Sequence, residues 1–208
     1  AFSSDATRVR FAAGLHPNSA GSLAEDWPGL TTLCRAPDCA AVGETGLDYH
    51  WDRATPEQQK FALDAHLQLA DELGKPVVIH CRDAFADIFE HLALFPRVRG
   101  VLHCFSGGIA EARRALDLGY SLSFAGPLTY PRNTALREAA AFAPADRVVV
   151  ETDAPFLPPQ SRRGKTNEPA CVVEVLATLA ELRGIEFAAA AALTTGNAER
   201  LFEGRVEA

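Results

Sequence analysis

The chain has 208 residues, of which 48% are hydrophobic and 23% charged, a composition typical of a globular protein. Its formal net charge of −7 argues against a protein that coats nucleic acid or membrane with a broad basic face. No apolar run approaches the roughly 18 residues of a membrane span, and no signal-peptide pattern opens the chain, so we expect a monomeric cytoplasmic protein without membrane contact.

Short apolar runs bounded by glycine, proline or charge recur along the chain, as expected of strands that are buried on both faces of a sheet. Helical patterns lie between them. Thr55, Pro56 and Gln58 are typical of a helix start, and apolar residues follow at every fourth position from Phe61 to Leu73. We predict strands at 9–14, 40–43, 77–80, 101–103, 120–124 and 148–152, and further helices at 109–116, 133–143, 169–183 and 195–202.

Alternating strands and helices imply a parallel sheet, either an open doubly wound sheet or a closed (β/α)8 barrel. No G-x-G-x-x-G or P-loop motif follows any strand, so the main signature of the nucleotide-binding open sheets is missing. Polar residues instead follow several different strands, which favours the barrel. The predicted fold is therefore α/β, a TIM-type (β/α)8 barrel that forms a single domain over residues 1–208.

Four predicted strands lead into a residue type that binds metals: Glu44, His80, His103 and Asp153. In a barrel the carboxyl ends of all strands face one mouth, so residues far apart in sequence converge there. Two imidazoles and two carboxylates suit Zn²⁺, Mn²⁺ or Mg²⁺, and the carboxylates favour the harder ions. A single histidine of this kind is more often a hydrogen-bonded structural residue, but four residues in equivalent positions indicate a metal site.

Other polar residues are candidates for substrate binding, each with a structural alternative. His16, in GLHPNS, either faces the same mouth as a substrate contact or proton donor, or is a turn residue before Pro17. Arg82 either meets an anionic substrate or pairs with Asp83. The segment QSRRGKTNEP is either a phosphate-binding loop or a solubilising one, and its basic residues are Arg162, Arg163 and Lys165.

The period of two along a strand separates each predicted histidine ligand from the cysteine after it. If His80 and His103 point into the barrel, Cys81 and Cys104 point toward the helices and behave as small buried hydrophobes. The absence of a C-x-x-C pair indicates reduced thiols throughout. Glu151 lies one layer deeper than the carboxylate two residues later and needs a partner that the sequence does not identify. The remaining histidines are predicted to face solvent: His50, His66 and His91.

Six segments occur in the order AVGETGLDYHWD, PVVIHCRDA, VLHCFSGG, VVVETDAPFL, RGKTNEP and TTGNAERLF. In order and spacing they resemble the motifs of the TatD-like metal-dependent deoxyribonucleases of the amidohydrolase superfamily. The resemblance extends from about Phe11 to Phe202. It implies a TIM-type barrel with two divalent metal ions (Mg²⁺, Mn²⁺ or Zn²⁺) and hydrolysis of DNA phosphodiester bonds by metal-activated water, as a 3′-to-5′ exonuclease.

Carried onto this sequence, the resemblance makes Glu44 a metal-bridging carboxylate, His80 and His103 ligands of one metal, and Asp153 a ligand that orients the attacking water. Asp153 is then the expected general base, and His16 lies near the substrate phosphate as a candidate leaving-group acid. Glu44, Asp153 and His16 form the expected catalytic set. The expected contacts with flanking phosphates of single-stranded DNA or 3′ ends are Arg82, Arg162, Arg163 and Lys165.

The family pattern also has an H-x-H pair at the end of the first strand, and this sequence contains none. We therefore expect this chain to begin after the first βα unit of the barrel. Two other functions stay open at this point. One is an amide, lactone or aminoacyl ester hydrolase with the same metal arrangement. The other is a catalytically inactive barrel that binds nucleic acid or a partner protein.

Overall fold

The computed structural model describes residues 9–203. Six parallel strands form one sheet in the order in which they occur along the chain. This confirms the predicted α/β fold with a parallel sheet, and consecutive neighbours are the arrangement of strands in a β/α barrel wall. The strands are β1 (Phe11–Ala13), β2 (Cys39–Asp48), β3 (Val77–Arg82), β4 (Gly100–Leu102), β5 (Ser121–Phe124) and β6 (Val148–Val150).

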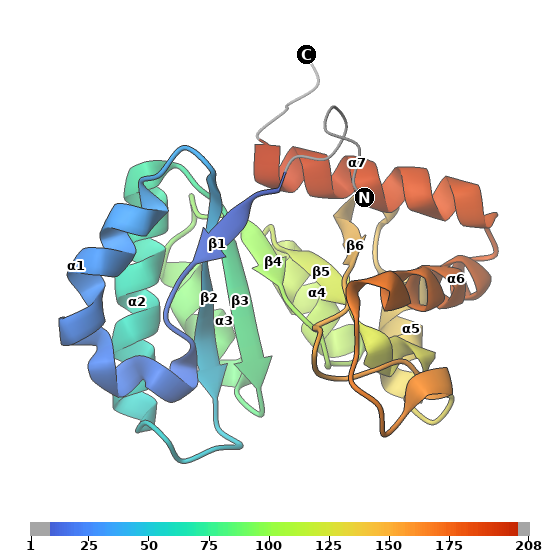
Figure 1. Cartoon of the computed structure of the whole chain (residues 1–208), viewed down its shortest axis with the longest axis horizontal. Helices are drawn as coiled ribbons and strands as arrows, with labels where there is room; N and C mark the ends of the chain where they lie inside the picture. Colours follow the sequence, from blue (N-terminus) through green and yellow to red (C-terminus); the bar gives the residue numbers. More distant parts are fainter. Residues whose placement is uncertain (1–8, 204–208) are drawn as a thin grey trace.

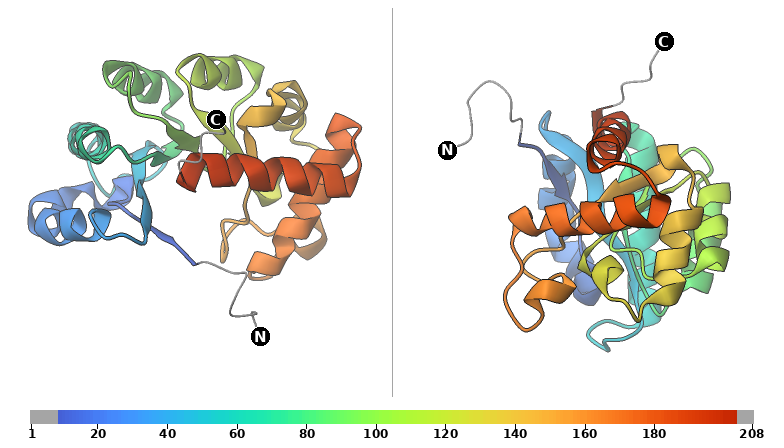
Figure 2. Two further views of the ribbon diagram at one scale, coloured as in Figure 1. Left: turned by 90° about the horizontal axis from the view of Figure 1, so that it is seen from above. Right: turned by 90° about the vertical axis from the view of Figure 1, so that its right-hand side faces the viewer.

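Apart from the last helix, which crosses the strands, the helices form an arc outside them, as the left view of Figure 2 shows. The helices are α1 (Leu23–Cys34), α2 (Pro56–Leu73), α3 (Phe85–Leu94), α4 (Ile109–Asp117), α5 (Thr134–Phe142), α6 (Val172–Arg183) and α7 (Phe187–Glu203). Short 3₁₀ helices are η1 (Pro17–Ser22), η2 (Gly126–Thr129), η3 (Ala145–Arg147), η4 (Gln160–Arg162) and η5 (Pro169–Cys171). None of the helices in residues 9–203 is both long and apolar enough to cross a membrane.

Helix α7 lies across the ends at which the strands begin (Figure 1). The buried side chain of Asn197 donates hydrogen bonds from Nδ2 to the carbonyl oxygens of Ala145 (2.8 Å) and Val148 (2.6 Å). At the other end of the helix, Arg10 Nη1 donates to the carbonyl oxygen of Phe202 (2.8 Å). One helix thus ties the start of β6 to the segment that enters β1, and it leaves the carboxyl ends of the strands open.

One layer of the core runs across four neighbouring strands. Ile79, Leu102, Leu122 and Val148 are successive register partners, and all are fully or almost fully buried. The next backbone N–H along β4, that of His103, donates to the carbonyl oxygen of Ile79 (2.9 Å). The residues that follow these apolar positions therefore lie at the same height along the strands, at the carboxyl end of the sheet.

Helix α2 confirms the predicted start and part of the predicted apolar face. Thr55 Oγ1 accepts from the Gln58 backbone N–H (3.3 Å), and Gln58 Oε1 accepts from the Thr55 N–H (2.9 Å), which completes a capping box. Phe61, however, is 71% exposed. Leu69 is buried and Leu73 packs against the core as predicted, and the buried face also includes two polar residues whose hydrogen bonds are satisfied inside the protein, Gln59 and His66.

The prediction that His66 faces solvent is wrong, since its exposed fraction is 0%. Nε2 accepts a hydrogen bond from the backbone N–H of Leu15 (3.0 Å), and Nδ1 lies 2.6 Å from the carbonyl oxygen of Ala62. Burial lowers the pKa of this imidazole, so it is neutral and joins α2 to the loop after β1. His50 is exposed as predicted, whereas His91 is partly buried beside Asp64.

Helices α1 and α3 have no counterpart among the predicted elements. Helix α1 contains Pro28 and Gly29, two residue types that oppose helix formation in a helix interior. Its buried residues Leu23, Leu30 and Cys34 pack into the main core. Tertiary burial therefore outweighs local propensity in this helix.

Strand β2 continues five residues beyond its predicted end, to Asp48. Its glycines Gly43 and Gly46 have positive φ angles of 141° and 146°, in a region that L side chains rarely adopt. A Cβ atom on Gly46 would lie 1.9 Å from the carbonyl oxygen of His80. The strand register shifts between Gly43 and Thr45. Glu44 thus sits at an irregularity of the strand, between two glycines that let β2 approach β3 closely.

We expect Gly46→Ala to lower the free energy of unfolding by about 2 kcal/mol or more, because the added methyl group collides with β3 backbone at a strained φ. Urea denaturation measures this loss. The matched control is Gly29→Ala, a helical glycine with open space around its Cβ position, which should be neutral or stabilising by up to about 1 kcal/mol. Equal effects of the two substitutions would contradict the close approach of β2 and β3.

Candidate metal centre

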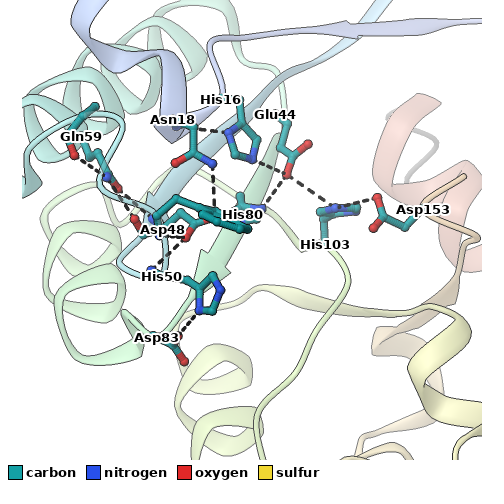
Figure 3. A network of polar contacts seen from close by, with 12 residues as sticks. His16, Asn18, Glu44, Asp48, His50, Gln59, His80, Asp83, His103 and Asp153 are labelled. Atoms are coloured by element: carbon teal, nitrogen blue, oxygen red, sulfur yellow. Dashed lines mark hydrogen bonds and ion pairs between the residues drawn. The ribbon is translucent and has the colours of Figure 1, made fainter. Parts of the chain in front are cut away.

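Glu44 lies at the centre of a cluster of polar side chains at the carboxyl ends of the strands (Figure 3). Its Oε1 atom is 2.8 Å from His80 Nδ1, 3.5 Å from His103 Nε2 and 3.8 Å from His16 Nε2. Burial opposes the ionisation of Glu44, but the hydrogen bond with His80 and the nearby imidazoles outweigh it, so the pKa of Glu44 is lowered. Glu44 is therefore a carboxylate around which three imidazoles converge.

His80 is held from its far side by Asp48. Its Nε2 atom lies 3.1 Å from Asp48 Oδ2, while Nδ1 faces Glu44. The other oxygen of Asp48 accepts hydrogen bonds from the backbone N–H groups of His50 (3.0 Å) and Trp51 (3.3 Å). An outer carboxylate of this kind fixes the orientation of an imidazole and leaves its inner nitrogen free for a metal.

Asp48 is a functional residue that the sequence analysis missed. The predicted strand ends at Gly43, five residues before Asp48. The available signal was the strand period of two: Glu44, Gly46 and Asp48 occupy alternate positions of β2.

His103 is held in the same way by Glu151, which supplies the partner that the sequence left open. Glu151 Oε2 lies 2.6 Å from His103 Nδ1, and Glu151 Oε1 accepts from the backbone N–H of Cys104 (2.7 Å). Burial opposes protonation of His103, but the hydrogen bond and charge of Glu151, with Glu44 and Asp153, raise its pKa to about 9. The inner nitrogen, Nε2, faces Glu44 and Asp153.

Asp153 approaches the cluster from the loop after β6. Its Oδ1 atom is 3.6 Å from His103 Nε2, and within residues 9–203 its carboxylate accepts no hydrogen bond. Its backbone φ is 58°, which is unusual for a residue other than glycine. Burial raises the pKa of Asp153, and the charges of Glu151 and Glu44 add to this effect against the opposing imidazole of His103. Asp153 is therefore a carboxylate with free oxygens beside the centre.

His16 faces the centre from the loop after β1, as one of its two predicted alternatives required. Nδ1 accepts a hydrogen bond from the backbone N–H of Asn18 (3.1 Å), so the proton of the neutral ring is on Nε2. Burial and the neighbouring His80 lower the pKa of His16, which keeps the ring neutral. In this tautomer His16 presents a hydrogen-bond donor to the centre rather than a metal-binding lone pair.

Two groups of three side chains have potential ligand atoms within 4.8 Å of one another: His16, Glu44 and His80, and His103, Glu151 and Asp153. Hydrogen bonds show which of these residues have an atom available to a metal ion. Both oxygens of Glu151 are engaged, by His103 and by the backbone N–H of Cys104, and His16 carries its proton on the inner nitrogen. The atoms left facing inward belong to Glu44, His80, His103 and Asp153. Such a mixed nitrogen and oxygen set fits a divalent metal ion.

Both cysteines that follow the metal-facing histidines are free thiols, as expected. Cys81 is partly buried against the main core, and burial raises its pKa to about 12. Burial also raises the pKa of Cys104, which the charges of Glu151 and Asp153 reinforce. Neither thiol is activated as a nucleophile.

The predicted substrate-binding cations lie outside the cluster and differ in their surroundings. Arg82 ends β3 and is exposed, with its guanidinium carbon 5.9 Å from the centre of the Trp51 ring. Arg162 pairs with Glu168 (2.5 Å), and Arg163 lies 4.8 Å from the centre of the Tyr130 ring. Lys165 is exposed. The basic segment is therefore partly neutralised by its own glutamate, which makes Arg162 the weakest of these candidates.

Asn167 fastens the loop that carries Asp153. Its side chain is buried, and Nδ2 donates to the carbonyl oxygens of Thr152 (2.7 Å) and Phe156 (2.7 Å). Its backbone N–H donates to the carbonyl oxygen of Pro155 (3.1 Å). Asn167 belongs to the segment RGKTNEP, whose basic residues alone are predicted to have a function. One amide thus holds both sides of the turn around Asp153.

The fold and the site together define a class, the metal-dependent hydrolases built on a parallel β/α sheet. A family model described as TatD related DNase matches residues 2–203. The chain therefore belongs to the TatD DNase family of the amidohydrolase superfamily and is a metal-dependent hydrolase.

Individual relatives agree with this assignment. The chain is 40% identical over 199 residues to the uncharacterized metal-dependent hydrolase YcfH of Escherichia coli K12, covering 93% of this chain and 74% of that protein. It is 40% identical over 204 residues to the 3′-5′ ssDNA/RNA exonuclease TatD of Klebsiella pneumoniae, covering 91% and 75%. The crystal structure of YjjV, a TatD homologue from E. coli K12, superposes with a TM-score of 0.82 at 33% identity, covering 93% and 76%.

Asn167→Ala should reduce the free energy of unfolding by about 1–3 kcal/mol, since it leaves buried carbonyl groups without a donor. It should also weaken Mn²⁺ binding, because the loop that carries Asp153 is released. Urea denaturation and calorimetric Mn²⁺ titration measure the two effects. Asn133→Ala is the control, because the exposed side chain of Asn133 makes one long hydrogen bond (3.3 Å) to Pro127. Unchanged metal affinity in the Asn167 variant would contradict a positioning role.

Proposed function

We propose that this protein hydrolyses the phosphodiester bonds of single-stranded DNA from the 3′ end. The observation that carries the proposal is the convergence of Glu44, His80, His103 and Asp153 from four different strands or the loops that follow them, with both imidazoles held by outer carboxylates. A catalytically inactive barrel has no need of such orientation. The substrate class is supported by the relatives named as 3′-5′ ssDNA/RNA exonucleases.

Different residues of the protein have different roles in the proposed hydrolysis. Divalent metal ions, when bound, lower the pKa of water and neutralise charge on phosphoryl oxygens. Asp153 accepts the proton of the attacking water, through a carboxylate that no described residue engages by hydrogen bonding. His16 donates its Nε2–H to a phosphate oxygen, and its lowered pKa favours this role over protonation of the leaving group. Glu44 and the inner nitrogens of His80 and His103 hold the metal ions.

Arg82, Arg163 and Lys165 provide positive charge outside the centre for the flanking phosphates. Such contacts give affinity that decreases with salt and does not depend on the base sequence. Arg162 contributes less, because Glu168 already compensates its charge. Phosphate contacts of this kind distinguish a nuclease from a hydrolase of small esters, which has no chain of phosphates to hold.

Asp153→Asn should lower the hydrolysis of single-stranded DNA at least about 100-fold, because an amide cannot accept the proton of the attacking water. The assay is Mn²⁺-dependent release of nucleotides from the 3′ end of an oligonucleotide, with urea denaturation to verify the fold. Asp146→Asn, at an exposed carboxylate in η3, is the control. Undiminished hydrolysis in the Asp153 variant would refute the assignment. Faster turnover of small carboxylic esters than of DNA by the wild type would move the substrate to the ester class.

Arg163→Glu should raise KM for single-stranded DNA and reduce the slope of log KM against log salt concentration by about 1, because one phosphate contact is lost. Steady-state kinetics at several NaCl concentrations test this. Arg113→Glu is the control, because Arg113 also lies near an aromatic ring (Phe142, 4.8 Å) but on the outer helix α4. If both variants keep the wild-type salt slope, the segment around Arg163 is a solvated loop and does not bind substrate.

A further inference from the structure

Trp51 is an exposed tryptophan in the loop between β2 and α2, on the side of the sheet where the metal centre lies. It is 47% exposed, although a large aromatic side chain stabilises a folded protein most when it is buried. The other tryptophan, Trp27, packs against the core beside His66, with ring centres 5.1 Å apart. The burial of Trp27 is explained by folding, whereas the exposure of Trp51 is not.

The loop that carries Trp51 is fastened to the metal centre. Asp48 Oδ1 accepts the backbone N–H groups of both His50 and Trp51, and Asp48 Oδ2 holds His80. The His50 ring meets the Trp51 ring edge-on, with centres 4.8 Å apart, and His50 Nδ1 lies 3.6 Å from Asp83 Oδ2 in the loop after β3. The exposed ring is therefore held at a set position relative to His80.

Two guanidinium groups flank this ring. The guanidinium carbons of Arg53 and Arg82 each lie 5.9 Å from the centre of the Trp51 ring. Arg53 comes from the same loop, whereas Arg82 ends β3, two residues after His80. A separation of 5.9 Å is near the outer limit of a cation–π contact, and the tryptophan remains 47% exposed with both arginines beside it. An exposed aromatic ring with two cations beside it matches a nucleobase and its neighbouring phosphates.

We propose that Trp51, with Arg53 and Arg82, forms a stacking platform for a nucleobase of single-stranded nucleic acid. This inference rests on the proposed function and specifies how that substrate is held beside the metal centre. The base stacks on the indole ring, and the guanidinium groups contact neighbouring phosphates. Unpaired strands are selected, because the bases of a duplex are already stacked on one another.

The acidic residues of the same loops offset part of this positive charge. Asp83 is engaged with His50, and Asp48 is buried beneath the loop. Asp52 is exposed and lies next to Trp51 in sequence. Two exposed carboxylates, Asp52 and Asp83, therefore lie near the two guanidinium groups, and the platform binds a strand through stacking as well as through local charge.

The kinetic test compares Trp51→Ala with Trp51→Phe. The alanine variant should raise KM for single-stranded oligothymidylate about tenfold and leave kcat within about twofold, whereas phenylalanine keeps KM within about threefold. Phe142→Ala is the matched control, since that ring is also exposed and also lies beside an arginine, but on α5. A KM in Trp51→Ala equal to that of the wild type would overturn the platform.

A binding test separates failure of the platform from failure of the proposed function. Trp27→Phe combined with Asp153→Asn leaves Trp51 as the single fluorescent tryptophan and removes the expected general base. Oligothymidylate should quench its fluorescence saturably, and an abasic oligonucleotide of the same length should bind about tenfold more weakly. Absence of quenching, or equal affinity for the two strands, would overturn the platform. Quenching by oligothymidylate in a protein whose wild type does not cleave DNA would retain the platform and refute the nuclease.

Discussion

The organisation of the metal centre depends on the pairing of each inner imidazole with an outer carboxylate. Asp48 holds one nitrogen of His80, and Glu151 holds one nitrogen of His103. Each ring therefore turns its other nitrogen toward Glu44. Without the outer carboxylates both rings would be free to rotate, and the ligand atoms would have no common point. The pairing also gives the buried Asp48 and the partly buried Glu151 hydrogen-bond partners near other acidic residues.

The pairing of Asp48 with His80 accompanies an approach of β2 to β3 that is closer than side chains normally permit. Gly43 and Gly46 provide the space, and they also give β2 the irregularity at which Glu44 lies. Glycine in a strand interior normally lowers the stability of the strand, but here the same segment positions both Glu44 and Asp48. Local backbone structure and metal-ligand geometry are thus determined by the same few residues.

Single polar side chains connect the centre to the loops around it. Asp48 joins the loop that carries Trp51 to His80. Asn167 joins the two sides of the loop after β6, which carries Asp153. Both side chains are buried, so their hydrogen bonds are protected from water. These hydrogen bonds therefore fix the positions of both loops relative to the candidate metal centre.

The sequence by itself determined the parallel α/β fold, and it selected Glu44, His80, His103 and Asp153, although Glu44 and His80 lie within β2 and β3 and do not follow them. Both results depend on short-range patterns, the continuous apolar runs of buried strands and the residue that comes next along the chain. The capping box of α2 is equally local. The family motifs led to the expectation that these residues take part in the hydrolysis of DNA.

Only the tertiary structure decided which polar groups meet. The partners of Glu151 and His66, the role of Asp48 and the tautomer of His16 all depend on contacts between segments that are distant along the chain or on a backbone whose path no local pattern reveals. Helix α1 formed despite Pro28, because core burial outweighed propensity. Periodicity predicts which face of an element is buried, but the hydrogen-bond partner of a buried polar group is chosen by the packing of the whole fold.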